Sequence, residues 1–231
     1  MKRKTKTSNS AYDFQDTLFQ PISDWAPATS FPDLSGERML GIDTETRDPQ
    51  ISTRGPGFIR GDAKVVGFSI ATRSRAWYFP FDHLSGGNLR REDCIAFAKT
   101  ILSDENRCIV GANLQYELEG FEAGLGIKNK CKVIDIQIAE ALIDEEADSY
   151  KLESLCKKYL GTGKDETLLR EAAEAYGVDP KSGMWKLHSK YVGPYAEFDA
   201  LAPMQIFEKQ LEILKAEETL GVFQLEMELL P

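Results

Sequence analysis

The sequence is poor in the residues that build metal cages or disulfide frameworks. Its 231 residues include two histidines and four cysteines, and no two cysteines form a C-x-x-C pair. This spacing predicts free, buried thiols in place of a structural zinc site or disulfide bonds. Also missing are the ~20 consecutive apolar residues of a membrane helix and the apolar stretch of a signal peptide. We therefore expect a cytoplasmic protein with no membrane partner.

Positive charge is also scarce. The 28 basic side chains are outnumbered by 37 acidic ones, which gives a net charge of −9. A protein that binds nucleic acid mainly by neutralising phosphate normally carries the opposite sign. A nucleic-acid partner would therefore have to be bound locally, in a small groove where metal ions let carboxylates approach phosphate.

Apolar residues make up 42% of the chain, which is enough for a sizeable core in one large domain. Short β-rich runs at 39–42, 65–71 and 76–79 predict three consecutive strands, and 48–62 is expected to be a long loop. Further elements are expected as follows: helices at 91–102, 114–123, 136–144, 151–160, 166–176 and 195–225, and strands at 108–110 and 132–134. The expected fold class is α/β, a mixed sheet flanked by helices, with a helical C-terminal half.

The first candidate site is the sequence Gly41 to Thr46, at the end of the first expected strand. Residues two apart on a strand point the same way, so Asp43 and Glu45 would place two carboxylates side by side. Such close like charges repel unless a cation lies between them, and a divalent ion with oxygen ligands is the natural partner. Two solvated acids at a strand end are the alternative reading of this short motif.

Two later motifs carry further acids. Asn113 follows the fourth expected strand and Glu117 lies one turn into the next helix, an arrangement that an ordinary capped helix start also explains. Tyr195 and Asp199 are four residues apart, on one face of a helix that Pro194 is expected to begin. Taken alone, Tyr195 is as readily explained by packing in the core.

Taken together and in this order, the three motifs resemble those of the DEDD superfamily of 3′-5′ exonucleases, tyrosine subtype. More closely, the chain is similar to the proofreading exonuclease domain that precedes the polymerase domain in family A DNA polymerases of phages and bacteria. The resemblance covers about residues 38–220 and is most specific over 42–46 and 193–200. The tyrosine subtype is indicated because the histidine subtype has His five residues before the last Asp, where this chain has Pro194.

The resemblance implies a ribonuclease H-like fold and a site with two divalent metal ions, Mg²⁺ or Mn²⁺. Such a pair of ions stabilises the attacking and leaving oxygens of an in-line phosphodiester hydrolysis. The implied substrate is the 3′ end of single-stranded or frayed DNA, and the product is a nucleoside 5′-monophosphate. The resemblance assigns metal binding to four acids, namely Asp43, Glu45, Glu117 and Asp199. It assigns orientation of the attacking water to Tyr195. It assigns contact with the substrate to Thr44, Asn113 and Tyr116.

The resemblance also implies a division of the chain. Residues 1–37 are expected to be a mobile basic arm and an irregular lead-in, and 38–220 the exonuclease domain. Residues 221–231 are expected to be either the start of a following polymerase domain or a C-terminal tail.

One residue departs from the family pattern, because Glu117 stands where the family has Asp. The extra methylene moves the carboxylate by about one bond length, a scale to which the octahedral geometry of Mg²⁺ is sensitive. Either the pocket has adjusted, or activity is reduced, or the residue was substituted deliberately. A catalytically silent nucleic-acid-binding domain, in which Glu117 spoils the second metal site, is therefore one alternative. An RNA-directed exonuclease of the same superfamily is the other.

Two further groups of residues are explained by ordinary surface or core positions without a functional role. Four lysines are expected on solvated helix faces, although contact with a DNA backbone is the alternative: Lys151, Lys157, Lys158 and Lys164. Four aromatic residues are expected mostly in the core, although stacking on terminal bases is the alternative: Tyr116, Phe121, Trp185 and Tyr191.

Overall fold

The computed structural model describes residues 20–230, so the predicted basic arm lies largely outside the described residues. Its centre is a five-stranded sheet with strand order β3-β2-β1-β4-β5. The strands are β1 (Met39–Arg47), β2 (Lys64–Ala71), β3 (Ala76–Pro80), β4 (Cys108–Gly111) and β5 (Lys132–Asp135). The first three pair antiparallel as a meander, whereas β4 and β5 run parallel to β1. The predicted mixed α/β fold is therefore confirmed.

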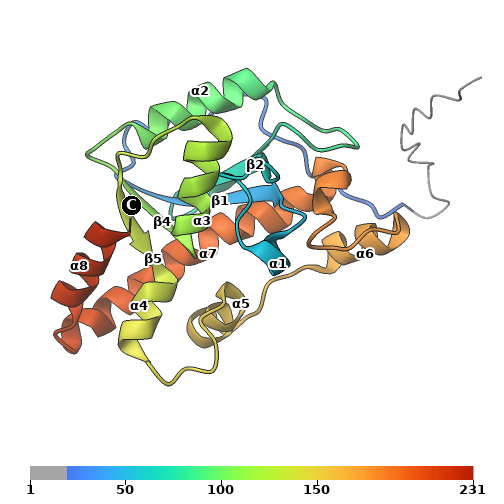
Figure 1. Ribbon diagram of the computed structural model, residues 1–231. Coiled ribbons are helices and arrows are strands. Elements are labelled where there is room, and N and C mark those ends of the chain that lie inside the picture. The colour runs from blue at the N-terminus through green and yellow to red at the C-terminus, as the bar shows by residue number, and fades with distance from the viewer. Residues whose placement is uncertain (1–19, 231) are drawn as a thin grey trace, which may run out of the picture.

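Helices cover both faces of this sheet. Long α7 lies against β1, β2, β3 and β4, and α2 lies on the opposite side of the sheet (Figure 1). The α-helices are α1 (Ile51–Arg54), α2 (Arg91–Leu102), α3 (Leu114–Glu119), α4 (Ile136–Ile143), α5 (Leu152–Leu155), α6 (Thr167–Ala175), α7 (Ser189–Ala216) and α8 (Leu220–Leu229). Two π-helical turns, η1 (Gly120–Gly124) and η2 (Cys156–Leu160), continue α3 and α5, and η3 (Met184–Lys186) is a 3₁₀ turn. The expected helices are thus present, although some boundaries differ.

The largest difference is at the last long helix, which begins at Ser189 instead of Tyr195. Its first turn is capped by the side chain of His188, whose Nδ1 accepts from the Lys190 amide at 3.2 Å. Pro194 consequently lies inside α7 and not at its start. The stretch before the proline is buried, so packing against the core outweighs the backbone hydrogen bond that a proline removes.

The expected helix 195–225 is also broken near its end. Glu218 has a φ of +59°, in the left-handed region, and the Thr219 amide donates back to the Leu214 carbonyl at 3.0 Å. Such a left-handed residue ends a helix and satisfies its last carbonyls. The chain then starts again as α8, whose Phe223 and Met227 are buried and whose Phe223 ring contacts that of Phe207.

The lead-in before β1 has no helix or strand among its described residues, as expected, and it packs on α7. Ser23 Oγ donates to the Lys190 carbonyl at 2.8 Å, and Trp25 Nε1 donates to Glu197 Oε1 at 3.0 Å. A Cβ at Gly193 would lie 2.1 Å from the Trp25 ring, so only glycine lets the indole lie against the helix here.

The four cysteines are free thiols, as predicted, and three of them are buried. Burial raises the pKa of Cys94 to about 12, which keeps this thiol protonated and inert. Within residues 20–230, no helix has the length and hydropathy needed to cross a bilayer.

One of the two histidines, His83, is buried with both ring nitrogens bonded. The Tyr78 hydroxyl lies 2.6 Å from Nε2, and Nδ1 lies 3.0 Å from the Leu187 carbonyl. The carbonyl can only accept, so Nδ1 carries the proton and Nε2 accepts from the tyrosine. Burial lowers the pKa of His83 from 6.5 to about 4.

Acid should therefore destabilise the fold through His83. Between pH 6.5 and 4 the unfolded chain binds a proton that the native imidazole rejects, so the free energy of unfolding should fall by about 3 kcal/mol from this group. Urea denaturation at several pH values would measure this, with His83→Gln as the variant that does not titrate. The variant should lose less stability than the parent as the pH falls; equal losses would contradict the assignment.

Candidate active site

The centre of the site is the second half of β1. Strand β4 pairs with β1 only over Met39 to Gly41, so the rest of β1 extends past its parallel neighbour. Asp43 and Glu45 lie on this extension. They therefore lie within the strand and not at its end as expected, because β1 continues to Arg47 with β2 as its partner.

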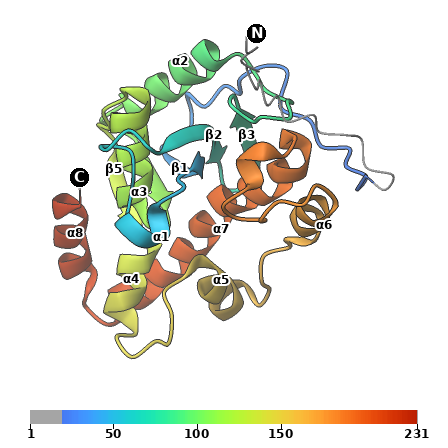
Figure 2. The same ribbon diagram turned by 45° about the vertical axis from the view of Figure 1, so that its right-hand side comes forward.

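Helix α7 approaches β1 unusually closely. A Cβ on Gly41 would lie 2.0 Å from the Ala200 carbonyl oxygen, so the absence of a side chain there lets helix and strand touch. Asp199 precedes Ala200 and is brought to the same part of β1. Figures 1 and 2 show α7 crossing the sheet next to β1, so residues far apart in the sequence meet here.

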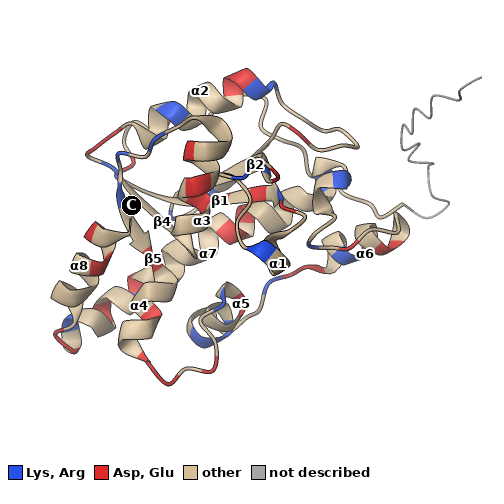
Figure 3. Cartoon of the chain, viewed as in Figure 1, with Lys and Arg blue, Asp and Glu red and all other residues tan. Residues whose placement is uncertain are grey.

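The third acid, Glu117, comes from α3, which follows β4 and is joined to the extended part of β1 by side-chain bonds at Thr44 and Thr46. Glu117 is 6% exposed, and its carboxylate accepts a hydrogen bond from the Thr44 hydroxyl. Thr44, predicted to contact substrate, thus holds an acid of the site. Figure 3 shows acidic residues of α3 gathered beside β1 and α7.

Asn113 does not cap α3 in the way the sequence suggested. It is exposed, has a left-handed φ of +60°, and makes no side-chain capping bond. Asp135 at the end of β5 does this work: its Oδ2 accepts from the Leu114 amide at 2.7 Å and its Oδ1 from the Gln137 amide at 2.8 Å. Asp135 therefore anchors the starts of both α3 and α4, and sequence reasoning missed it.

The acids repel one another electrostatically. Burial and then the neighbouring carboxylates raise the pKa values of Asp43 and Glu45 well above their usual range. Burial raises the pKa of Glu117 to about 8, although its bond from Thr44 works in the opposite direction. Burial also raises the pKa of Asp199, opposed by Lys164. Four acids that resist ionisation together form a site prepared for positive charge.

A lysine enters this site, contrary to the expectation that it lies on a solvated surface. Lys164 Nζ is 2.7 Å from Asp199 Oδ2 and 3.5 Å from the Tyr195 hydroxyl. Tyr195 and Asp199 therefore share one face of α7, as their spacing predicted. Lys157 and Lys158 instead pair with acids elsewhere, Lys158 with Glu140 at 2.6 Å.

Tyr116, another predicted substrate contact, ties α3 to the loop after β1. Its hydroxyl lies 2.9 Å from Thr46 Oγ1 and donates to Asp48 Oδ2 at 3.3 Å. The same Asp48 oxygen accepts from the Gly57 amide at 3.0 Å. Burial raises the pKa of Tyr116, so its hydroxyl stays protonated.

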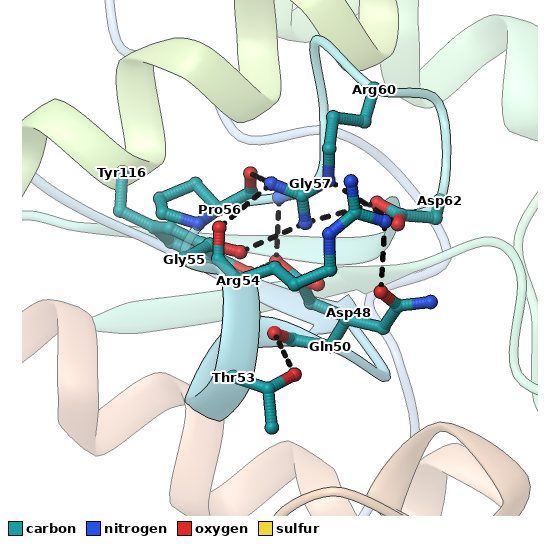
Figure 4. A network of polar contacts seen from close by, with 10 residues as sticks. All are labelled: Asp48, Gln50, Thr53, Arg54, Gly55, Pro56, Gly57, Arg60, Asp62 and Tyr116. Atoms are coloured by element: carbon teal, nitrogen blue, oxygen red, sulfur yellow. Dashed lines mark hydrogen bonds and ion pairs between the residues drawn. The ribbon is translucent and has the colours of Figure 1, made fainter.

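Figure 4 shows how an arginine orders that loop. The Arg60 guanidinium donates to three successive carbonyls, those of Arg54, Gly55 and Pro56, at 3.0, 3.0 and 2.7 Å. It also pairs with Asp62 at 3.3 Å. The loop predicted over 48–62 is therefore a folded structure beside the site, and it contains the short helix α1.

Of the four aromatic residues expected mostly in the core, two are buried there and two, Tyr116 and Trp185, are half-buried. Phe121 and Tyr191 are fully buried and have no free face for a base. Trp185 is half-buried, with Arg47 4.6 Å from its ring centre and the Lys186 ammonium at 5.5 Å. Since Arg47 ends the strand that carries Asp43, this cation–π contact places Trp185 of η3 beside the end of that strand.

The oxygen donors fit a divalent ion. Glu45 Oε1 and Asp199 Oδ1 are buried without a hydrogen-bond partner, an uncommon state for carboxylate oxygens unless a cation completes them. Among residues 20–230, however, no three His, Cys, Asp or Glu side chains form a ready-made metal cage. The acidic site therefore offers hard oxygen ligands and a need for positive charge without being closed around an ion.

Comparison with known proteins defines the class. The sequence profile of the 3′-5′ exonuclease family matches residues 30–215, and the chain belongs to this family. A DNA-directed DNA polymerase of Pseudomonas phage M6 is 41% identical over 224 residues, which are 94% of this chain but 34% of that protein. The chain therefore spans about a third of the length of this relative.

Solved structures agree on the fold. NrnC of Brucella melitensis with bound Mg²⁺ superimposes with a TM-score of 0.60 at 17% identity, over 87% of this chain and 86% of that one. Escherichia coli RNase D, an exoribonuclease, gives 0.58 at 17% identity, over 85% of this chain and 45% of that one. The fold is ribonuclease H-like, as the three motifs implied.

Proposed function

We propose that this chain is a metal-dependent 3′-5′ exonuclease of the tyrosine subtype that proofreads for a DNA polymerase. The observation that carries the proposal is the meeting of four acids at β1, two of which have buried, unpaired oxygens. Asp43, Glu45, Glu117 and Asp199 would hold up to two Mg²⁺ or Mn²⁺ ions. Bound there, the ions would supply a lowered pKa for the attacking water and charge stabilisation for the leaving oxygen.

The chain's own residues prepare the rest of the reaction. The Tyr195 hydroxyl stays protonated, because burial and the nearby acids raise its pKa, so it can orient the attacking water by a hydrogen bond. Thr44 fixes Glu117, while exposed Asn113 and half-buried Tyr116 are available to the terminal nucleotide. Arg47 would supply positive charge, and Trp185 an aromatic ring, to the DNA nucleotides that precede the terminal one.

DNA is the proposed substrate, with a nucleoside 5′-monophosphate as product. The similarity to a phage DNA polymerase supports this choice and the presence of a polymerase domain after residue 231 in the same protein. The proposed limits are 38–220 for the exonuclease domain, after the lead-in 1–37, with 221–231 leading into the polymerase. The similarity to RNase D makes RNA the substrate to compare.

The test is cleavage of 5′-labelled single-stranded DNA, and of RNA of the same sequence, with Mn²⁺ or with a chelator. A ladder that shortens from the 3′ end of DNA, needs the metal and releases nucleoside 5′-monophosphates is expected. Preferential shortening of RNA would identify RNA as the substrate. If both oligonucleotides stay intact, the chain is a catalytically silent nucleic-acid-binding domain.

Glu117→Asp distinguishes an adjusted pocket from a damaged one. Glu117 is held by Thr44, so the shorter side chain should lose this bond and cleavage should fall about tenfold, equivalent to ~1.4 kcal/mol. Initial rates on single-stranded DNA measure this, with exposed Glu122→Asp as the matched control. A tenfold gain would instead indicate that Glu117 impairs the natural site.

A further inference from the structure

Lys164 is held in its position by the loop between η2 and α6. Gly161 turns the chain with a φ of +73°, and the Lys164 amide donates to Glu153 Oε2 at 3.0 Å. A Cβ at Gly163 would lie 2.7 Å from the other oxygen of Glu153, so the loop lies directly on that carboxylate. These constraints fix the backbone from which the lysine side chain reaches the site.

The ammonium group is almost as buried as the acid that it contacts. The side chains of Lys164 and Asp199 are 10% and 6% exposed, and their charged atoms are 2.7 Å apart. The ammonium also lies 5.0 Å from the centre of the Tyr195 ring. A buried lysine is costly unless it is paired, so this position requires the acids around it.

The electrostatic effects run in both directions. Burial disfavours the charge of Lys164, and the nearby carboxylates of Asp199, Asp43 and Glu45 offset that cost. In return, the ammonium attracts the same three carboxylates. One positive charge thus offsets the repulsion of several negative ones.

The contact also leaves part of Asp199 available. Lys164 binds Oδ2, whereas Oδ1 is buried without a partner. An ion at Oδ1 would lie near the ammonium, and two cations that share one carboxylate repel. The lysine therefore orients the carboxylate and competes electrostatically with a metal ion for it.

We infer that Lys164 is the internal counter-ion of the acidic site: it positions Asp199 in the metal-free protein and weakens the binding of a divalent ion there. The inference rests on the proposed metal-dependent function for its second part only. Its first part concerns the metal-free chain and holds whatever the chain cleaves.

The first arm of the test is thermal melting of the 231-residue chain in chelator. Lys164→Met should lower the melting temperature in the parent and have less than half that effect in an Asp199→Asn background, because the partner charge is gone. Lys157→Met, an exposed lysine paired with Glu153, is the matched control and should have equal small effects in both. Additive effects of Lys164→Met and Asp199→Asn would overturn the inference.

The second arm is calorimetric titration with Mn²⁺ in the absence of nucleic acid. Lys164→Met should bind the ion about tenfold more tightly than the parent, and Lys164→Arg should stay near the parent because it keeps the charge. A lysine needed only for folding would leave the affinity unchanged or weaker, which would overturn the inference. If Lys164→Met does not fold in chelator, Lys164→Gln, which keeps a hydrogen-bond donor without charge, takes its place in both arms.

Failure of the proposed function is distinguishable from failure of this inference. If the parent chain neither binds Mn²⁺ nor cleaves oligonucleotides, the proposed metal-dependent function is wrong. The melting experiment would still decide whether Lys164 is the counter-ion. A parent that cleaves, with additive melting effects, would retain the function and overturn the role of Lys164.

Discussion

Asp43→Asn is expected to abolish cleavage and, in the absence of metal, to stabilise the fold. The substitution keeps the shape of the side chain and removes one of the carboxylates that would bind the ions. Those ions are worth several kcal/mol to the reaction, so a loss of at least about 10³-fold is expected. The rate of shortening of labelled single-stranded DNA with Mn²⁺ measures it.

The gain in stability has a separate origin. Burial, followed by the charges of Glu117, Asp199 and Glu45, raises the pKa of Asp43. An acid whose pKa is higher in the folded state destabilises that state at every pH above its unfolded value of about 3.9. Asparagine removes this effect, so at pH 7 in chelator the melting temperature should rise by a few degrees.

The two readouts together separate chemistry from folding. Asp93→Asn, at an exposed position of α2, is the matched control and should change neither. A variant that loses activity because it unfolds would show a lower melting temperature. Undiminished cleavage by Asp43→Asn would remove this residue from the reaction altogether.

The sequence predicted the strands and the placement of acids wherever local periodicity decides them. Asp43 and Glu45 are two apart on a strand, and Tyr195 and Asp199 are four apart on a helix, so backbone geometry alone orients each pair. The mixed sheet followed from the apolar runs, and its meander was confirmed. The catalytic roles of these residues stay predictions until the variants are measured.

Contacts between distant segments were not predictable in this way. Lys164 lies 35 residues before Asp199, in a polar loop whose sequence carries no periodic signal. Asp135 caps a helix that begins 21 residues earlier, a role visible only once β4 and β5 are paired. The helix start predicted at Pro194 was wrong, because the local preference of proline for a first helical turn is weaker than the packing of the buried turn before it.

Glu117→Gln is expected to change how the stability of the metal-free chain depends on pH. The pKa of Glu117 is about 8 in the folded chain, because of burial, against 4.5 for the unperturbed group. Between these values the native state holds a proton that the unfolded state releases, so parent stability falls as the pH rises from 4.5 to 8. At about 1.36 kcal/mol per pH unit, this acid contributes roughly 3–5 kcal/mol to that fall.

Glutamine should remove this part of the slope while keeping the bond from Thr44, because its amide oxygen accepts from the same hydroxyl. Urea denaturation in chelator should therefore find the variant and the parent similar near pH 5 and the variant clearly more stable at pH 9. Glu122→Gln, an exposed residue a little further along the same helical segment, should follow the parent throughout. A difference that stays constant with pH would mean that Glu117 is already ionised in the folded site. The repulsion that makes this site ready for a cation would then have to reside in Asp43, Glu45 and Asp199 alone.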